Sequence, residues 1–200
     1  MATDDERILR HVLDFGGQAV MTRSDHASGT DRCAEVAEAL SGFDIVVNIQ
    51  GDEPFIRPEQ IEAALAPLLS SSDVGIATLA KKMAHREDIF NPNVVKVVFN
   101  ERGQAMYFSR SPIPYLRGVP EAEWPGNVDF YKHIGLYAFR RDILTALTKL
   151  SMSAHEQAES LEQLRWLDAG YAIAVTVTPY ETIGVDTPED VARALREGLG

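Results

Sequence analysis

The sequence has one cysteine in 200 residues and no apolar run of the roughly 18 residues that cross a bilayer as a helix. No membrane-spanning segment is therefore predicted. Cys33 has no second cysteine with which to form a disulfide, and the first residues carry neither the basic nor the apolar stretch of a secretory signal. Together these features predict a reducing, cytoplasmic setting, with Cys33 as a half-buried packing thiol.

Positive charge is also scarce. The chain carries 19 lysine and arginine residues against 30 aspartate and glutamate residues, which gives a formal net charge of −11. No local basic stripe offsets this charge, so nucleic acid is not a predicted partner. Small anionic ligands stay compatible with it, because a bound divalent cation and a few placed Arg or Lys side chains reverse the local field.

Several familiar catalytic motifs are missing. The sequence contains no HExxH, no pair of CxxC motifs and no EF-hand loop, so the usual support for a zinc or calcium site is lacking. It also contains no GxSxG, P-loop or GxGxxG motif. Hydrolase, kinase-like and dinucleotide-dependent dehydrogenase functions are therefore not indicated.

The hydrophobic pattern alternates between helical and strand-like segments. Apolar residues at helical spacing predict helices over residues 4–15, 31–40, 142–150, 155–168 and 188–197, and one that begins at Pro58. Short β-branched runs predict strands over residues 18–22, 44–50, 75–79, 94–99, 105–109, 131–139 and 171–178. This alternation predicts a single α/β domain over residues 1–200 with a mostly parallel sheet, and the turn at 100–103 makes that sheet mixed.

Two acidic motifs lie where ligands of open α/β sheets gather, just past the carboxyl ends of strands. Asp52 of QGDEP follows the strand predicted over 44–50, and Asp186 of GVDTPED comes one residue before a capped helix start. Asp52 is also explained as an acidic turn residue leading into a helix, and Asp186 as a solvated loop residue. If the two carboxylates meet at one crevice, they suit Mg²⁺, which prefers oxygen ligands.

A polar loop forms a third candidate site. Residues 23–32, RSDHASGTDR, are dense in hydrogen-bonding groups and lead into a helix N-terminus, a natural site for an anion or a nucleotide edge. The same residues are also explained as a polar loop that ends in a helix cap. Arginines in a chain of charge −11 favour an anionic ligand.

Seven short strings, each weak alone, occur in a specific order along the chain. They are RSDHASGTDR, NIQGDEPFI, FNPNVVKVV, YFSRSPIP, HIGLYAF, LEQLR and GVDTPED. Together they resemble the 3-deoxy-manno-octulosonate cytidylyltransferases, also called CMP-Kdo synthetases. The resemblance implies a Rossmann-like α/β nucleotidyltransferase fold in a homodimer. It also implies that CTP and the sugar acid Kdo give CMP-Kdo and pyrophosphate with Mg²⁺, for lipopolysaccharide biosynthesis.

The resemblance implies roles for individual residues. Asp52 and Asp186 would hold the metal and act in catalysis. The implied nucleotide-binding residues are Arg23, Ser28, Gly29, Thr30 and Gln50. The implied sugar-binding residues are Arg110, His133, Tyr137, Glu162 and Gln163. Without the resemblance, Tyr137 is explained as a strand core residue, His133 as a structural histidine, and Glu162 with Gln163 as a solvated helix face.

One part of the family pattern is absent. Members usually open with a strand and a loop whose arginine and lysine bind the triphosphate, whereas residues 2–4 resemble the end of their second strand. The resemblance therefore predicts an N-terminally truncated enzyme whose neighbouring strands have an open edge. Two alternatives stay open: a cytidylyltransferase for a sialic-like or amino-Kdo sugar acid, and an inactive fragment that binds sugar or nucleotide.

Overall fold

The computed structural model describes residues 1–181, 184–185, 187, 191–192 and 195–196. The predicted metal ligand Asp186 lies outside the described residues, and so does most of the helix predicted over 188–197. Among the described residues, no helix combines the length and the apolar character that a bilayer crossing requires.

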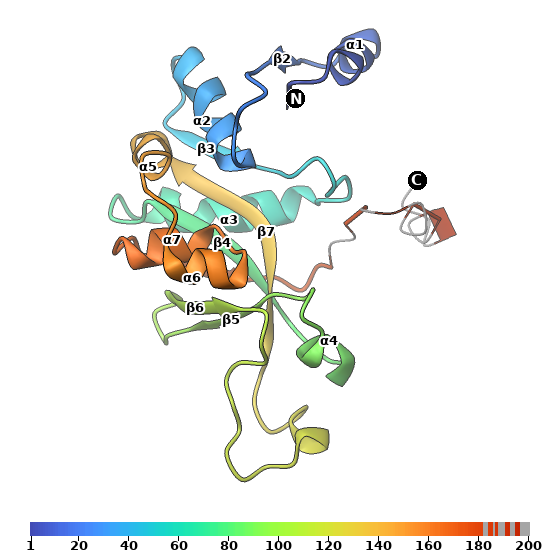
Figure 1. Ribbon diagram of the computed structural model, residues 1–200, viewed down its shortest axis with the longest axis vertical. Coiled ribbons are helices and arrows are strands. Elements are labelled where there is room, and N and C mark those ends of the chain that lie inside the picture. The colour runs from blue at the N-terminus through green and yellow to red at the C-terminus, as the bar shows by residue number, and fades with distance from the viewer. Residues whose placement is uncertain (182–183, 186, 188–190, 193–194, 197–200) are drawn as a thin grey trace.

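Helices and strands alternate along the chain (Figure 1). The helices are α1 (Glu6–Asp14), α2 (Gly29–Ala39), α3 (Pro58–Ser70), α4 (Arg86–Phe90), the 3-10 turn η1 (Glu121–Glu123), α5 (Arg141–Leu147), α6 (Ala154–Glu159) and α7 (Gln163–Asp168). The strands are β1 (Ala2–Thr3), β2 (Val20–Met21), β3 (Ile45–Asn48), β4 (Ile76–Lys82), β5 (Lys96–Phe99), β6 (Ala105–Ser109), β7 (Tyr131–Arg140) and β8 (Ile173–Val177).

Local signals explain most of these boundaries. The side chain of Asp5 caps α1 by accepting a backbone hydrogen bond from its first turn, and Pro58 begins α3 as predicted. Gly103 has a φ of 71° in the turn between β5 and β6, a conformation that glycine adopts without strain. The predicted hairpin is confirmed. The helix α2 begins two residues earlier than predicted, at Gly29, because Ser28 is its N-cap.

A six-stranded mixed sheet forms the centre of the fold, with strand order β6-β5-β7-β4-β8 and with β3 paired to β7. Strands β3, β4, β5 and β8 point one way, and β6 and β7 point the other. The predicted mixed α/β sheet is confirmed. Strand β7 lies between strands of the opposite direction, so all of its described pairs are antiparallel. In the described part of this sheet, the parallel pair is β4–β8.

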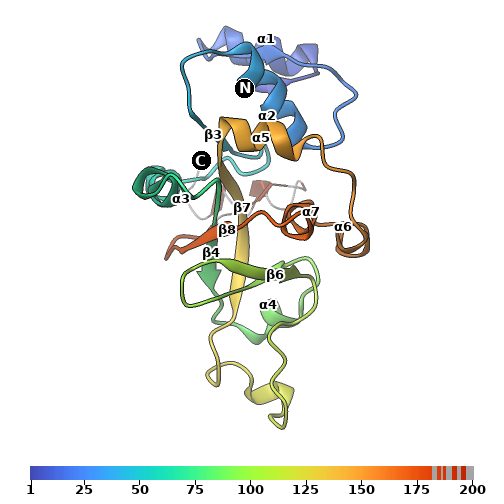
Figure 2. The ribbon, with the colours of Figure 1, turned by 90° about the vertical axis from the view of Figure 1, so that its left-hand side faces the viewer.

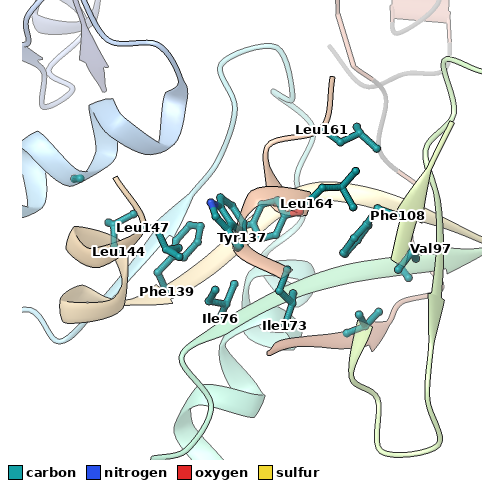
Figure 3. Close-up of a cluster of buried hydrophobic side chains, with 14 of the residues drawn as sticks. Ile76, Val97, Phe108, Tyr137, Phe139, Leu144, Leu147, Leu161, Leu164 and Ile173 are labelled. Atoms are coloured by element: carbon teal, nitrogen blue, oxygen red, sulfur yellow. The ribbon is translucent and has the colours of Figure 1, made fainter. Parts of the chain in front are cut away.

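Helices cover both faces of this sheet (Figure 2). Helix α3 packs on one face, where Leu68 joins a core with alternate residues of β4 and β7, including Ala77. Helices α2, α5 and α7 pack on the other face around Ile76, Tyr137 and Trp166. Figure 3 shows Tyr137 within this second, larger core. The alternation of neighbouring β4 residues between two cores follows from the two-residue period of a strand.

Strands β1 and β2 form a separate parallel pair outside the main sheet. Residues 45–47 of β3 are only partly buried, because the described pairing of β3 is with β7 alone. An apolar groove of about 270 Å³ lies beside β3, and its lining includes Ala2, Cys33 and Phe43. The half-buried position predicted for Cys33 is confirmed.

The proline-rich segment 111–129 extends from the sheet as an arm (Figures 1 and 2). The arm contains η1 and shares a small core made of Met83, Ile89, Trp124 and Phe130. The rings of Trp124 and Phe130 stack with their centroids 5.8 Å apart. This proline-rich segment is therefore a packed extension with its own apolar centre.

Candidate active site

The loop before α2 is bonded to the segment between α6 and α7. Ser28 Oγ donates to Glu162 Oε1 at 3.0 Å, and Thr30 Oγ1 donates to Glu162 Oε2 at 2.7 Å. Ser28 Oγ also accepts from the N–H of Asp31 at 3.2 Å, which makes Ser28 the N-cap of α2. Two residues predicted for the nucleotide and one predicted for the sugar acid thus form one hydrogen-bonded group.

Gly29 lies between these two hydroxyls and faces Gln50. A Cβ atom at this position would lie 3.3 Å from Oε1 and 3.4 Å from Nε2 of Gln50, and 3.8 Å from Nδ2 of Asn48. A larger residue at Gly29 would therefore displace Gln50 or move the start of α2. The structure brings Ser28, Gly29, Thr30 and Gln50 together just past the end of β3.

The prediction of a single helix over 155–168 is wrong, because residues 160–162 interrupt the helix and separate α6 from α7. Ser160 takes the left-handed conformation, with a φ of 52°, and ends α6. Leu161 then turns into the main core. The break leaves Glu162 facing α2 and buries Gln163 at the start of α7, so Gln163 does not lie on a solvated helix face.

Glu162 is a partly buried carboxylate. Desolvation raises the pKa of its carboxyl, and the hydrogen bonds from Thr30 and Ser28 oppose this shift. Arg165 lies 3.9 Å away and adds positive charge. Arg165 is itself held by Glu156, which accepts from its Nε at 2.8 Å and from its Nη2 at 2.6 Å. This paired network fixes the carboxylate of Glu162 from both sides.

Arg110, predicted for the sugar acid, is held by main-chain carbonyls. Its Nε donates to the carbonyl of Glu159 at 2.7 Å, its Nη1 to that of Pro92 at 3.1 Å, and its Nη2 to that of Ser160 at 3.4 Å. The Glu159 carboxylate in turn accepts from the N–H of Arg110 at 2.9 Å. Because arginine has five N–H donors, these bonds leave one N–H on each terminal nitrogen.

Lys96 is a fully buried cation that the sequence patterns did not single out. Its Nζ donates to the carbonyls of Asn91 at 2.9 Å, Val94 at 2.6 Å and Arg110 at 2.5 Å, which uses all three ammonium N–H groups. Burial lowers the pKa of Lys96. The ammonium group joins the start of β5 to the residue after β6 and so fixes the backbone of Arg110.

A bulge in β7 brings His133 and Tyr137 together. Thr78 of β4 pairs with Tyr137, but the next residue, Leu79, pairs with Ile134, so β7 carries two extra residues at this point. Four residues of regular strand span about 13 Å. The ring centroids of His133 and Tyr137 are instead 5.2 Å apart. Burial lowers the pKa of His133 to about 3, so its imidazole is neutral at neutral pH.

Tyr137 is both a core residue and an unsatisfied polar group. Its side chain packs against Phe139 and, edge to face, against Trp166 with ring centroids 5.1 Å apart. Its hydroxyl is buried and meets no partner in full hydrogen-bond geometry among the described residues. Desolvation raises the pKa of Tyr137 well above its ordinary value, while a looser interaction with the Thr78 hydroxyl opposes this rise. A buried donor of this kind is costly unless a ligand or water satisfies it.

The segment from residue 159 to residue 166 contacts Arg110, Tyr137 and the loop before α2. Its carbonyls accept from Arg110, Glu162 accepts from the α2 loop, and Trp166 packs on Tyr137. The structure therefore brings Arg110, Tyr137, Glu162 and the α2 loop together around one short segment. No local pattern in the sequence pointed to Glu159 or to the break that forms this segment.

Arg23 lies apart from this group. Its side chain is 68% exposed, and its Nε is 3.5 Å from both Asp25 Oδ1 and Glu35 Oε2. His26 hydrogen-bonds to Glu35, and this bond is the main cause that lowers the pKa of the Glu35 carboxyl. These residues line a cavity of about 560 Å³. In the described part of the chain, no hydrogen bond or ion pair joins Arg23 to Gln50.

Asp52 is exposed in the turn after β3. Its backbone carbonyl accepts from the N–H of Val185 at 2.7 Å. Val185 immediately precedes Asp186, so the segment that leads to the second predicted metal ligand is bonded to the residue that carries the first. Within the described ranges, no group of three or more His, Cys, Asp or Glu side chains is arranged to hold a metal ion.

Comparisons with known proteins identify the family of this chain. The profile of the family described as Cytidylyltransferase matches residues 1–176. A 3-deoxy-manno-octulosonate cytidylyltransferase of Cytophaga hutchinsonii is 55% identical over 195 residues, which cover 96% of this chain and 77% of that protein. Another, of Parabacteroides distasonis, is 54% identical over 200 residues, which cover 98% of this chain and 79% of that protein.

Solved structures give the same result. A CMP:2-keto-3-deoxy-manno-octonic acid synthetase complexed with CTP superposes with a TM-score of 0.89 at 45% identity, over 100% of this chain and 80% of that chain. HddC of Yersinia pseudotuberculosis, complexed with GMP-PN, superposes with a TM-score of 0.63 at 10% identity, over 99% of this chain and 76% of that chain, and so shares the fold. The predicted Rossmann-like nucleotidyltransferase fold is confirmed. The chain belongs to the cytidylyltransferase family, among the 3-deoxy-manno-octulosonate cytidylyltransferases.

Proposed function

We propose that this protein transfers the cytidylyl group of CTP to the sugar acid Kdo and releases pyrophosphate, which makes CMP-Kdo for lipopolysaccharide biosynthesis. The observation that carries this function is the bonding of Ser28 and Thr30 to Glu162, because it joins the nucleotide-side loop to the sugar-side segment. The names of relatives at about half identity, and the CTP complex of the similar synthetase, support the same substrates.

The reaction is an in-line displacement at phosphorus. The 2-hydroxyl of Kdo attacks the α-phosphorus of CTP, loses its proton as the new P–O bond forms, and the bond to pyrophosphate breaks. Catalysis of this kind depends mainly on positioning and on neutralising charge. The chain supplies positioning through groups that are already held in place before any ligand binds.

On the sugar side, Arg110 is suited to the carboxylate of Kdo. Its free N–H groups lie on the two terminal nitrogens, which is the arrangement that takes a carboxylate with two hydrogen bonds. The unsatisfied hydroxyl of Tyr137 is suited to a sugar hydroxyl, which would remove its desolvation cost. We assign His133, Glu162 and Gln163 to the same sugar-acid pocket.

On the nucleotide side, we assign Ser28, Gly29, Thr30 and Gln50 to the cytidine nucleotide. The lack of a side chain at Gly29 supports this role, because it lets polar groups such as the Gln50 amide approach the backbone at the start of α2. Arg23, which lies apart and is exposed, is assigned to charge complementarity at the edge of the same loop.

A magnesium ion fits the chemistry of Asp52. The carboxylate is exposed, so water molecules can complete the octahedral shell that Mg²⁺ prefers. Asp52 and Asp186 would hold the ion, and the backbone bond between Asp52 and Val185 supports the nearness of their two segments. When bound, Mg²⁺ would neutralise phosphate charge and polarise the α-phosphate. We also propose a homodimer and a cytoplasmic setting, which the family resemblance and the single cysteine support.

The experiment that tests this function measures pyrophosphate release from CTP and Kdo with Mg²⁺. We expect release that requires all three components. Matched controls replace CTP with UTP, and Kdo with N-acetylneuraminic acid, because a sugar-acid pocket built for Kdo discriminates between these acids. Release with N-acetylneuraminic acid but not with Kdo would move the assignment to another sugar acid, and binding without any release would leave only a binding role.

A further inference from the structure

Thr78 stands opposite the bulge of β7 and contacts three groups with one hydroxyl. The residue is fully buried in β4. Its Oγ1 lies 2.9 Å from the carbonyl oxygen of Leu136, 3.1 Å from that of Ile134 and 3.0 Å from Nε2 of His133. Leu136 is one of the two extra residues of the bulge, and Ile134 is the residue at which regular pairing resumes.

The proton positions in this group follow from donor counting. A carbonyl oxygen only accepts, and a hydroxyl has one proton to donate. If Thr78 donated that proton to His133, both carbonyl oxygens would face lone pairs of Oγ1 with no proton between them. If Thr78 donates to the carbonyls instead, Oγ1 accepts from His133, and the imidazole proton lies on Nε2.

The other ring nitrogen of His133 is then an acceptor. Nδ1 has no hydrogen-bond partner in the described part of the chain. It keeps some contact with solvent, so a ligand can reach it. The ring plane is held by aromatic neighbours, with the ring of Phe108 at a centroid distance of 5.1 Å and that of Tyr137 at 5.2 Å. His133 therefore presents a lone pair in a fixed direction.

We infer that Thr78 is a positioning residue that holds His133 as the Nε2–H tautomer, so that Nδ1 accepts a hydrogen bond from a hydroxyl group of the sugar acid. A neutral acceptor recognises a hydroxyl donor and gives no attraction to a carboxylate. In this arrangement His133 binds a hydroxyl group of the sugar acid, and Arg110 binds its carboxylate. This inference rests on the proposed function for the identity of the ligand, and on the geometry alone for the tautomer.

The tautomer is tested by nitrogen NMR on protein with ¹⁵N-labelled imidazoles. The chain has five histidines, and a His133→Gln sample identifies the signals of His133 by their loss. We expect the wild-type protein to show a protonated Nε2 and an unprotonated Nδ1 at neutral pH. A proton on Nδ1, or on both nitrogens, would overturn the inference without use of any variant of Thr78.

The positioning role is tested by steady-state kinetics of Thr78→Val and Thr78→Ser. The valine removes the hydroxyl at similar size, and the serine keeps it. We expect Thr78→Val to raise KM for Kdo by roughly tenfold, the scale of one hydrogen bond, with KM for CTP unchanged. We expect Thr78→Ser to restore both KM for Kdo and the Nε2–H signal.

Equal losses in both variants with an unchanged tautomer would assign Thr78 to support of the bulge alone and overturn the inference. An unchanged KM for Kdo in Thr78→Val would also overturn it. If wild-type protein with the expected tautomer releases no pyrophosphate with Kdo, the proposed function fails, and the hydroxyl-recognition part of the inference fails with it. The Thr78–His133 contact is then still decided by the NMR measurement.

Discussion

The inner and outer halves of the candidate site differ in how their side chains are held. The inner half contains His133, Tyr137 and Glu162, which lie in β7 and at the α6–α7 break with packed or hydrogen-bonded neighbours. The outer half contains Arg23, Gln50 and Asp52, whose side chains are exposed. The fold thus orders His133, Tyr137 and Glu162 by itself, whereas it leaves the side chains of Arg23, Gln50 and Asp52 exposed.

This difference determines what a substitution in each half should change. A buried, partnered group contributes to the free energy of unfolding as well as to binding. An exposed group with few contacts contributes to binding or catalysis with little effect on stability. If a substitution in the outer half also lowered stability, or one in the inner half left it unchanged, the two halves would not differ in this way.

The largest expected effect on stability is at the ion pair that supports the α6–α7 break. The side chains of Glu156 and Arg165 are 7% and 12% exposed. We expect Glu156→Gln to lower the free energy of unfolding by about 3 kcal/mol, because it leaves the Arg165 charge buried with one partner less. Denaturant unfolding measures the change. As a control, Asp129→Asn at the exposed Lys82–Asp129 pair should leave stability unchanged. Equal effects at both pairs would contradict the expected difference.

The largest expected effect on activity is in the outer half. We expect Asp52→Asn to lower kcat/KM by at least about 100-fold, because the variant removes the charge of a proposed metal ligand. The denaturation midpoint should not move, since the side chain is exposed. Pyrophosphate release over a range of Mg²⁺ concentrations makes the measurement, with Asp73→Asn as the control at another exposed aspartate. Full activity in Asp52→Asn would remove this residue from the metal site.

A smaller and opposite pair of effects is expected at Tyr137. Tyr137→Phe removes a buried hydroxyl that meets no partner in full hydrogen-bond geometry among the described residues. We expect the free energy of unfolding to rise by about 1 kcal/mol, because the desolvation cost of the hydroxyl disappears. KM for Kdo should rise at the same time, by roughly tenfold, because the ligand loses a hydrogen bond. A destabilised Tyr137→Phe protein with unchanged KM would mean that the hydroxyl serves the fold and not the ligand.

The smallest expected effect is the pH dependence that comes from Glu162. Its folded-state pKa is raised above the ordinary glutamate value of 4.5, mainly by desolvation. A carboxyl with a raised pKa gives its stabilisation in full below 4.5 and loses it as pH rises through the folded-state pKa. We therefore expect wild-type protein to lose stability relative to Glu162→Gln between pH 4.5 and neutral pH. A difference that stays constant with pH would show that the hydrogen bonds from Ser28 and Thr30 fully compensate the burial.

Much of the fold could be predicted from local patterns. The helix that begins at Pro58 and the hairpin around Gly103 depend on residues with strong backbone preferences. The break at Ser160 could not be predicted in this way, because serine has little preference for the left-handed region. The bulge in β7 is also set by packing between strands rather than by the residues around it.

The residues of the candidate site were named by the family resemblance rather than by local residue patterns. The bond between Ser28 and Glu162 joins positions that are 134 residues apart, and no local spacing encodes such a contact. The sequence placed Lys96 inside a short apolar strand and gave no sign that its ammonium group binds the backbone carbonyl of Arg110. The role of Thr78 could not be predicted either, because β-branched residues such as threonine are common in strands.

The two tryptophans of the chain lie in different cores, and this gives the protein two separate optical reporters. Trp124 is buried in the small core of the arm, and Trp166 is buried beside Tyr137 in the main core. A Trp166→Phe protein would emit from the arm alone, and a Trp124→Phe protein from the main core alone. Fluorescence of the two variants during unfolding would therefore show whether the arm melts with the sheet or before it, and titration with Kdo would show which of the two cores senses the ligand.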